Sequence, residues 1–387
     1  MVSCYKRKII RSATVPMSLE SFLDGTIRPL MERYELVLVS SPDPELEALH
    51  RAHGVKVIGV PMERHISLVR DVVALLRLVR VLRRERPYMV HSMTPKAGLL
   101  CMMAAWLARV PRRVHTFTGL VWPTAVGLKR KVLMLTDWLT CACATHIIPE
   151  GEGVMHDLQR HITKKPMRVL GYGNVKGVDM EYWDAAMVHD DAVALRRSLF
   201  GDEDVFVFLS VGRLVGDKGL NELVAAFERL QVQPGYEKAR LVLVGRAEEE
   251  LDPLKPATWE RIHQLPSIVE AGPAYGRGLL AWYAASDCFI LPSYREGFPN
   301  TVLEAGAMGL PSIVTDINGS REIVEDGKNG IVIPSKDADA LYDAMKRMME
   351  DGRLRKSMAE NARPMIASRF EQGFVRQCLL DFYEEIL

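Results

Sequence analysis

The stretch Ser293-Tyr-Arg-Glu-Gly-Phe-Pro-Asn-Thr-Val-Leu-Glu-Ala-Gly-Ala-Met-Gly-Leu-Pro311 decides how the second half of the chain folds. It predicts a strand end, a sharp loop and a helix that Asn300 or Thr301 can cap. A helix start leaves backbone N–H groups unpaired and carries partial positive charge, so such a loop can hold a phosphate. The carboxylates of Glu296 and Glu304 would repel phosphate unless they face other groups, such as sugar hydroxyls. The stretch therefore indicates a site for a sugar attached to phosphate.

Size and composition limit the class of protein. A chain of 387 residues exceeds one ordinary hydrophobic core and favours two domains. Its 48% hydrophobic and 26% charged residues are typical of a globular protein. The six cysteines form no disulfide framework, which fits a reducing cytosol. No signal peptide and no apolar run of roughly 18 residues are present, so we expect a cytoplasmic protein without a transmembrane segment.

Charge is divided unequally along the chain. Residues 1–175 carry 26 Lys and Arg against 14 Asp and Glu, a net charge of +12, whereas the remainder carries −11. The basic residues cluster in 64–86, at Arg112-Arg113 and in 129–131. In the first cluster Ile66, Val69, Val73, Leu76, Val79 and Leu82 keep helical spacing, which predicts an amphipathic helix with a basic outer face. A solvated surface explains one such helix, but three basic patches in one half also predict contact with an anionic membrane surface.

Strand and helix patterns alternate in both halves of the chain. In the first half we expect strands over 37–40, 56–60, 88–92, 113–118 and 146–149, with helices over 44–53, 64–86, 96–109 and 130–142. In the second half we expect strands over 205–211, 239–244, 288–291, 311–315 and 331–333, with helices over 219–231, 279–285, 302–308, 337–351 and 351–385, the last broken near Pro364. Such alternation favours parallel sheets covered by helices on both faces.

The glycines in 171–179 interrupt the alternation, as a hinge would. The sequence thus predicts an α/β protein of two Rossmann-like, doubly wound domains facing each other across a cleft. The first domain covers 1–175 and the second 176–365, and the helix over about 366–387 is expected to pack back on the first. Functional residues of such sheets lie at the carboxyl ends of strands, which points to 14–18, 91–96 and 116–122.

A phosphate clamp is predicted in 209–220, between a strand and a helix. Gly212 and Gly219 let the backbone turn closely, while Arg213 and Lys218 can both reach one anion. The spacing of a Walker loop is missing, and no dinucleotide fingerprint follows Val244. An ordinary loop with surface cations is the alternative.

Polar residues at two strand ends of the first half can bind a phosphorylated or glycosylated acceptor. His91, Thr94, Lys96, His115, Thr118 and Trp122 offer donors, a cation and an aromatic ring. A lone histidine near a strand is more often a structural residue, and this interpretation applies more strongly to His115 than to His91. Cys141, Cys143 and His146 do not make a convincing metal site, because a structural zinc needs a fourth ligand.

Three motifs together resemble glycosyltransferase family 4, whose members are retaining enzymes with the GT-B fold of two Rossmann-like domains. They are Ser210-Val-Gly-Arg213 with Lys218-Gly219, the stretch from Ser293 with Glu296 and Glu304 in the E-x7-E spacing, and the segment 319–330. In the first half, the segments 12–19, 91–100 and 115–119 are similar to members that assemble bacterial capsule or O-antigen repeat units on polyprenyl diphosphate.

The resemblance implies a role for each matching residue. Arg213 and Lys218 would hold the diphosphate of a nucleotide sugar without a metal ion or other cofactor, Glu304 would bind the ribose, and Glu296 would grip the donor sugar. It implies Arg213, Lys218 and Glu296 as catalytic residues, Gly212, Gly297, Phe298, Asn300, Thr301 and Glu304 as donor-binding residues, and His91, Thr94, Lys96, Thr118 and Asn174 as acceptor-binding residues.

Two positions depart from the pattern of the family. The segment 14–18 stands where many members have a Gly-Gly loop, and Thr118 stands where many have a histidine near the reacting carbon. The chemistry usually drawn for the family is attack on the same face of the sugar, with the departing phosphate accepting the proton. Electrostatic stabilisation of the leaving group would then carry much of the rate.

The expected function is transfer of a hexose-type sugar from a nucleoside-diphosphate sugar, with UDP as the expected nucleotide, to a lipid-linked saccharide in capsule or lipopolysaccharide synthesis. The partners expected are the nucleotide sugar, the lipid-linked acceptor and the inner face of the plasma membrane, to which the protein would bind peripherally, and no nucleic acid. Two alternatives stay open, a GT-B nucleotide-sugar epimerase and a non-catalytic nucleotide-sugar-binding subunit of a membrane complex.

Overall fold

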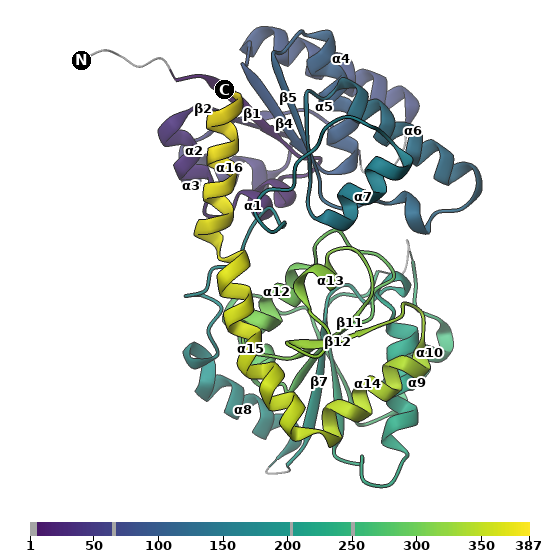
Figure 1. The fold of residues 1–387 in the computed structure, drawn as a ribbon. Coiled ribbons are helices and arrows are strands. Elements are labelled where there is room, and N and C mark those ends of the chain that lie inside the picture. The colour runs from purple at the N-terminus through teal and green to yellow at the C-terminus, as the bar shows by residue number, and fades with distance from the viewer. Residues whose placement is uncertain (1–5, 64–66, 202–203, 249–251) are drawn as a thin grey trace. The chain divides into compact units, whose positions relative to one another are not determined.

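The computed structural model describes residues 6–63, 67–201, 204–248 and 252–387. The chain forms two compact units, Met1–Gly177 with Gln372–Leu387 and Val178–Glu371 (Figure 1). It therefore passes from one unit to the other twice, once in each direction.

The first unit is built on a parallel sheet of six strands in the order β3-β2-β1-β4-β5-β6. Its strands are β1 Lys8–Ser12, β2 Glu35–Ser40, β3 Lys56–Gly59, β4 Met89–Met93, β5 Arg112–Phe117 and β6 His146–Pro149. Its helices are α1 Pro16–Leu23, α2 Ile27–Arg33, α3 Pro44–His53, α4 Leu68–Glu85, α5 Pro95–Leu107, α6 Gly127–Cys143, α7 Glu152–His161 and α16 Gln372–Ile386, with a short 3-10 helix at Trp122–Thr124.

The second unit repeats this architecture with the order β12-β11-β10-β7-β8-β9. Its strands are β7 Phe206–Val211, β8 Ala239–Val244, β9 Ile268–Gly272, β10 Cys288–Leu291, β11 Ser312–Thr315 and β12 Gly330–Ile333. Its helices are α8 His189–Phe200, α9 Leu220–Gln231, α10 Pro256–Gln264, α11 Gly276–Ala284, α12 Asn300–Ala307, α13 Ser320–Ile323, α14 Ala338–Glu350 and α15 Gly352–Phe370, with 3-10 helices at Ala185–Val188 and Gly216–Lys218.

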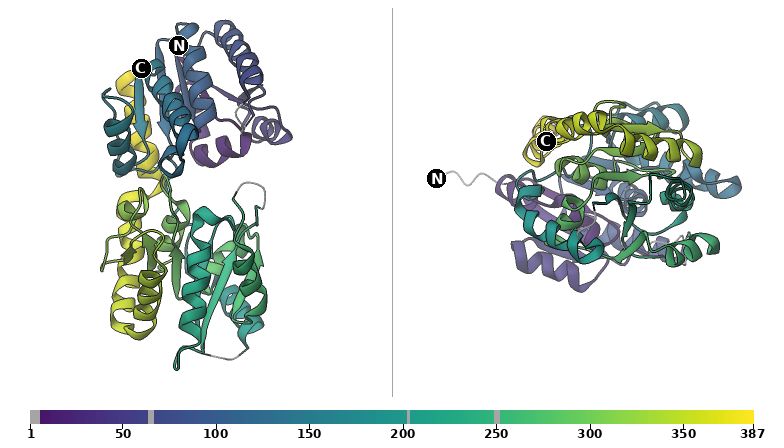
Figure 2. Two further views of the ribbon diagram at one scale, coloured as in Figure 1. Left: turned by 90° about the vertical axis from the view of Figure 1, so that its right-hand side faces the viewer. Right: turned by 90° about the horizontal axis from the view of Figure 1, so that it is seen from below.

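Each sheet is buried on both faces because its strands are apolar at nearly every position. Successive residues of a strand point to opposite faces, and in β1 Ile10 packs in one core cluster while Ile9 packs in the other. In β7 Leu209 and Phe208 are divided between two clusters in the same way. Figure 2 shows helices on both sides of each sheet. The predicted doubly wound architecture is confirmed, and both strand orders are those of a Rossmann fold.

Helix α16 belongs to the first unit although it follows the second in sequence. Leu380, Phe382 and Tyr383 enter the same core cluster as β1 and β2. The Tyr383 hydroxyl accepts a hydrogen bond of 2.7 Å from Nη1 of Arg11, which is buried at 2% exposure. The core of the first unit is therefore completed by residues from the far end of the sequence.

The predicted helix break near Pro364 is wrong. Pro364 lies inside α15, whose residues on both sides of it, Met358 and Ile366 among them, are buried in the core of the second unit. The chain instead leaves the helix at Glu371, which has φ −57° and ψ 136° and pairs with Val178 in an isolated parallel bridge. Packing of one continuous apolar face outweighs the hydrogen bond that a proline removes.

The predicted orientation of the basic helix is also partly wrong. Arg64 and Ile66 lie outside the described residues. Within α4 the buried residues are Ala74, Leu78, Val79 and Leu82, whereas Val69, Val73 and Leu76 are 78%, 41% and 59% exposed. The uncharged residues from Leu68 to Leu82 are all apolar. Apolar residues therefore occur around the whole helix, and their spacing could not show which face is buried. The outer face of α4 is consequently apolar as well as basic.

Candidate active site

Two loops meet at the centre of the second sheet. Strands β7 and β10 are neighbours at the point where the strand order reverses, and in such sheets ligands bind in the crevice outside the carboxyl ends of these strands. The loops that follow are 212–219 and 292–299. The fold thus brings the predicted clamp and the predicted E-x7-E motif to one edge of the sheet.

Glycines allow these loops to approach each other closely. Gly219 has φ +71°, and a Cβ at this position would lie 2.1 Å from the carbonyl oxygen of Pro292. Gly319, in the segment between β11 and α13, has φ +76°, and its Cβ would lie 2.3 Å from the carbonyl oxygen of Gly297 in the second loop. A side chain at either position would clash with backbone. The loops are therefore held in place by contacts that only glycine permits.

Lys218 and Glu296 form an ion pair across the two loops. Their side chains are 20% and 14% exposed, so solvent screens this pair less than an ordinary surface pair. Lys218 also lines a small pocket together with Gly212 and Arg213. The ammonium group is thereby held at the edge of the sheet by a carboxylate that a ligand can also contact.

Arg213 does not share the partner of Lys218. Its Nη1 lies 2.7 Å from Oε2 of Glu248, and its side chain is 47% exposed. The two predicted clamp residues thus line one pocket, but each is paired with a different carboxylate. An anion that bound both cations would replace the two carboxylates as their partner.

Glu304 lies in the second turn of α12 and is oriented by Tyr283. The Tyr283 hydroxyl donates to Oε2 of Glu304 at 3.0 Å. Burial, and then the nearby Glu304 carboxylate, raise the pKa of Tyr283 well above its usual value, so the hydroxyl keeps its proton. Tyr283 therefore fixes the position of a carboxylate that stays partly exposed. Sequence reasoning missed Tyr283, because nothing in the motif indicates a partner 21 residues earlier.

The predicted side-chain cap of α12 is wrong. Asn300 is the first residue of the helix, the N-cap is Pro299, and no side chain caps it. The amides of the first turn are therefore not occupied by a capping side chain, which suits an anion site. Thr301 and Gly297 are partly exposed beside this helix start, whereas the ring of Phe298 packs in the core against Phe370 at 5.4 Å. Phe298 can contact a ligand through its backbone alone.

Further contacts that the sequence did not predict connect the same two loops. Nη2 of Arg295 lies 2.8 Å from Oδ2 of Asp217. The Tyr294 hydroxyl donates to Oε2 of Glu222 at 2.6 Å, and the Tyr294 amide donates to the Asp217 carbonyl at 2.8 Å. These contacts connect the two loops next to the Lys218–Glu296 pair.

In the first unit, the strand ends predicted to be functional do meet. The Thr14 amide donates to Oγ1 of Thr94 at 3.1 Å, and the two hydroxyls lie 2.9 Å apart. Thr94 has φ +68°, an unfavourable conformation for a β-branched residue that is common at functional sites. These loops occupy the strand-order reversal of the first sheet, between β1 and β4.

His91 is a buried structural residue. Its Nδ1 lies 2.5 Å from the Tyr383 hydroxyl and its Nε2 lies 2.7 Å from the Thr116 hydroxyl. Burial, and then Arg11 and His115, lower the pKa of His91 well below its usual value, so the ring is neutral. This placement contradicts the prediction that His91 contacts the acceptor. His115 is buried too, with its pKa lowered to about 3 by burial.

Two other predicted acceptor residues are engaged within the first unit. Asn174 is 3% exposed, and its Oδ1 accepts from the amides of Lys176 and Gly177 at 2.9 and 2.6 Å. Its side chain holds a turn, which contradicts a direct contact with ligand. Nζ of Lys96 lies 2.6 Å from both carboxylate oxygens of Asp71. The role of Lys96 stays a prediction.

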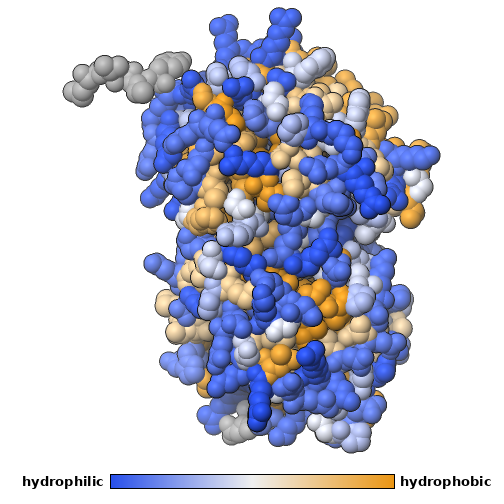
Figure 3. Space-filling model, viewed as in Figure 1, coloured by the Kyte–Doolittle hydropathy of each residue, from blue (hydrophilic) through white to orange (hydrophobic). Residues whose placement is uncertain are grey.

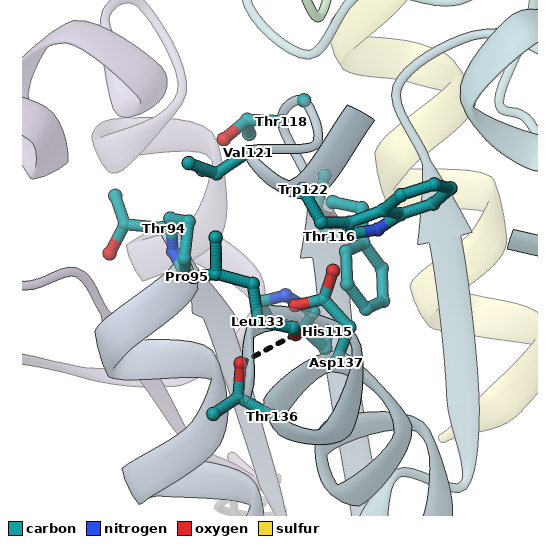
Figure 4. Close-up of a pocket in the computed structure, with 12 residues that line it drawn as sticks. Thr94, Pro95, His115, Thr116, Thr118, Val121, Trp122, Leu133, Thr136 and Asp137 are labelled. Carbon is teal, nitrogen blue, oxygen red and sulfur yellow. Dashed lines mark hydrogen bonds between the residues drawn. The ribbon is translucent and has the colours of Figure 1, made fainter. Parts of the chain in front are cut away.

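Thr94 and Thr118 line a pocket beside α6, shown in Figure 4. His115, Thr116 and Trp122 line it as well. Of the predicted acceptor residues, these two threonines are therefore placed where a ligand can reach them.

No group of three or more His, Cys, Asp or Glu side chains is arranged to hold a metal ion within the described ranges. Cys141 is buried, and burial raises its pKa to about 12. A thiol in this state is a poor metal ligand.

Comparison with known proteins identifies the family. Residues 22–173 match the model described as a glycosyl transferase 4-like domain, and residues 193–365 match that of glycosyl transferases group 1. An Escherichia coli protein named UDP-Gal:alpha-D-GlcNAc-diphosphoundecaprenol alpha-1,3-galactosyltransferase is 31% identical over 328 residues, covering 82% of this chain and 80% of that protein. The chain belongs to glycosyltransferase family 4.

Other relatives of this family 4 glycosyltransferase agree. The capsular polysaccharide biosynthesis glycosyltransferase CapM of Staphylococcus aureus is 29% identical over 386 residues, 98% of each chain. The crystal structure of Anabaena Alr3699/HepE in complex with UDP-glucose matches with a TM-score of 0.79 and 19% identity over 98% of this chain and 99% of that one. That likeness confirms the predicted GT-B fold. The relatives are named as transferases, which favours the predicted enzyme class over the epimerase and the non-catalytic subunit.

Proposed function

We propose that this family 4 glycosyltransferase moves a hexose or N-acetylhexosamine from a UDP-sugar to a saccharide on polyprenyl diphosphate, with retention of configuration, in capsule or O-antigen synthesis. The observation that carries the proposal is the E. coli relative, whose name gives UDP-Gal as donor and a diphosphoundecaprenol-linked sugar as acceptor. The HepE crystal structure, which is a complex with UDP-glucose, supports the same class of donor.

The second unit would bind the donor. Lys218 and Arg213, which line one pocket, would hold the diphosphate together with the first turn of α12. Glu304, oriented by Tyr283, would accept hydrogen bonds from the ribose hydroxyls. Glu296 would contact the donor sugar from its position beside Lys218.

The reaction would proceed on one face of the sugar. The bond between the anomeric carbon and the β-phosphate oxygen breaks, the acceptor oxygen bonds to the same carbon, and the acceptor proton passes to the departing phosphate. No protein base takes part. Lys218 and Arg213 would stabilise the negative charge that develops on the UDP leaving group, a role that needs no metal ion.

The test begins with a thermal-shift screen against UDP-, GDP- and ADP-sugars. The UDP-sugars are expected to raise the midpoint, because only a ligand that binds the folded state does so. The effective donor is then incubated with a saccharide on polyprenyl diphosphate in the presence of EDTA, and the product anomer is read by NMR. Binding without transfer would favour a non-catalytic subunit, and an inverted product would contradict retention.

We also propose that the protein binds peripherally to the inner face of the plasma membrane through α4, α5 and α6 of the first unit. These helices expose apolar side chains on a basic surface. No helix in the described part of the chain is long and apolar enough to cross a membrane. The exposed apolar residues are Leu68, Val69, Val72, Val73 and Leu76 of α4, Trp106 and Leu107 of α5, and Val126, Leu128, Leu135 and Trp138 in or beside α6.

Basic side chains surround these residues. Arg77, Arg80, Arg83 and Arg84 are exposed on α4, and Lys129, Arg130 and Lys131 are exposed on α6. Figure 3 shows hydrophobic side chains along the upper right edge, where α4 and α6 lie. Apolar residues that enter the interface, among cations that attract anionic lipids, are typical of a peripheral membrane surface.

The triple variant Lys129→Gln/Arg130→Gln/Lys131→Gln is expected to lower partitioning onto vesicles of anionic phospholipid by about 100-fold, since each basic residue near the surface contributes ~1 kcal/mol. A vesicle flotation assay at rising salt measures this effect. The matched control is Lys238→Gln/Arg353→Gln/Lys356→Gln, three exposed cations of the second unit. Equal loss in both variants, or wild-type binding that salt does not weaken, would contradict the proposed surface.

A further inference from the structure

Two polar groups face the pocket beside α6 without a satisfied partner. Nε1 of Trp122 is buried and makes no hydrogen bond. The indole N–H lies close to the Asp137 carboxyl and offsets part of the rise in its pKa that burial causes, but the two groups do not form a hydrogen bond. Apart from this indole, Asp137 has no hydrogen-bond or ion-pair partner among the described side chains. A buried donor and a half-buried acceptor thus lie side by side.

The pocket around them is open to solvent, and both polar and apolar side chains line it. Figure 4 shows Asp137 and Trp122 on one side and Thr94 with Pro95 on the other. Val121 and Leu133 supply apolar wall, and Thr118 lies at the rim.

The unpaired groups select the chemistry of the ligand. A hydroxyl can accept from the indole N–H and donate to the carboxylate at the same time, whereas a phosphate would be repelled by Asp137. The threonines of the lining can form hydrogen bonds with further hydroxyls, and the apolar wall can pack against an apolar face of a ring. A sugar ring has this combination, and a single bridging water satisfies only the two central groups.

We propose that this pocket is a subsite for a sugar ring of the acceptor, in which Asp137 accepts hydrogen bonds from ring hydroxyls and the indole N–H of Trp122 donates to one of them. This inference rests on the proposed function, namely that the first unit binds a saccharide acceptor. It assigns acceptor recognition to two residues outside the motifs that resemble the family.

The environment of Asp137 gives the subsite a pH signature. Burial raises the pKa of Asp137 to about 7, so the free pocket holds a mixture of neutral and ionised carboxyl near neutrality. Hydroxyl donors favour the ionised form. The other titratable or charged groups nearby are His115 on β5, Cys141 on α6, and His161 and Arg130 against the Trp122 ring. His115 and Cys141 stay neutral from pH 6 to 8.

Asp137→Asn and Asp137→Ala test the proposal. Both are expected to lower kcat/KM for the acceptor by about 10- to 100-fold, mainly through KM, since they remove a charge-assisted hydrogen bond. In wild type the same parameter should rise about tenfold from pH 6 to 8, and the variants should lose this rise. The thermal shift produced by a UDP-sugar should be unchanged. Asp24→Asn is the control, because Asp24 is exposed in the same unit.

Each other outcome has a definite meaning. Wild-type acceptor kinetics in both variants would overturn the subsite and leave a bridging water as the occupant. A fall in kcat/KM with the pH dependence retained would assign Asp137 a structural role and also overturn it. Failure of the proposed function looks different, because wild type would then neither transfer sugar nor respond to a UDP-sugar.

Discussion

Replacing Lys218 with alanine is expected to lower kcat for sugar transfer by at least about 100-fold, since one preorganised donor at a developing negative charge contributes that much or more. Lys218 is the partly buried cation at the strand-order reversal of the second sheet, held there by Glu296. The measurement is kcat with a saturating UDP-sugar and the lipid-linked acceptor. A wild-type kcat in this variant would contradict the proposed leaving-group contact.

The ion pair requires a control for stability, because either single variant leaves a partly buried charge alone. The double variant Lys218→Met/Glu296→Gln removes both charges and should keep the unfolding midpoint near that of wild type. Its kcat should be close to that of the slower single variant, since the two residues act as a unit. Arg229→Ala is the matched control, because its ion pair with Asp339 lies on the exposed surface.

The Tyr383→Phe variant is expected to lose about 2–4 kcal/mol of unfolding free energy, far more than a surface hydroxyl contributes. Arg11 is 2% exposed, and its guanidinium donates to the Tyr383 hydroxyl and to Sδ of Met93 at 2.9 Å, while its Nε is unpaired. The hydroxyl is therefore the main oxygen partner of a buried cation. Denaturation in urea measures the loss.

A double-mutant cycle distinguishes this cause from poorer packing. Arg11→Met/Tyr383→Phe should be more stable than Tyr383→Phe alone, because the buried charge is gone. The control is Tyr236→Phe, whose hydroxyl bonds Glu350 at the surface and should contribute within about 0.5 kcal/mol. Equal losses at Tyr383 and Tyr236 would contradict the proposed role of the hydroxyl.

Local patterns predicted most of the elements that carry the donor site. The strand Cys288–Leu291 and the strand Ala239–Val244 begin and end where the sequence indicates, because an uninterrupted apolar run is bounded by polar or turn residues. The clamp and the E-x7-E motif are each contained in one loop and its helix. Alternation predicts that both loops lie at the carboxyl edge of a parallel sheet, and the observed strand order makes them neighbours there.

Features that depend on distant residues could not be predicted. In the sequence, His91 is a polar residue at a strand end. Its partner Tyr383 lies 292 residues away, so only the fold shows that the imidazole ring is buried. Strand β1 escaped prediction because its five residues include the two charged positions Lys8 and Arg11. Asp137 interrupts an otherwise apolar stretch, and its position on the inner side of α6 is decided by packing.

The return of α16 to the first unit affects how the protein is made. The second unit is continuous in sequence and can fold as it leaves the ribosome. The first unit must wait while roughly 200 further residues are synthesised, about 10–40 s at the usual rate of elongation. During that interval the surface destined for Leu380, Phe382 and Tyr383 is open, and Arg11 has not met its hydroxyl partner. The part of the chain that is synthesised first is therefore the last to complete its core.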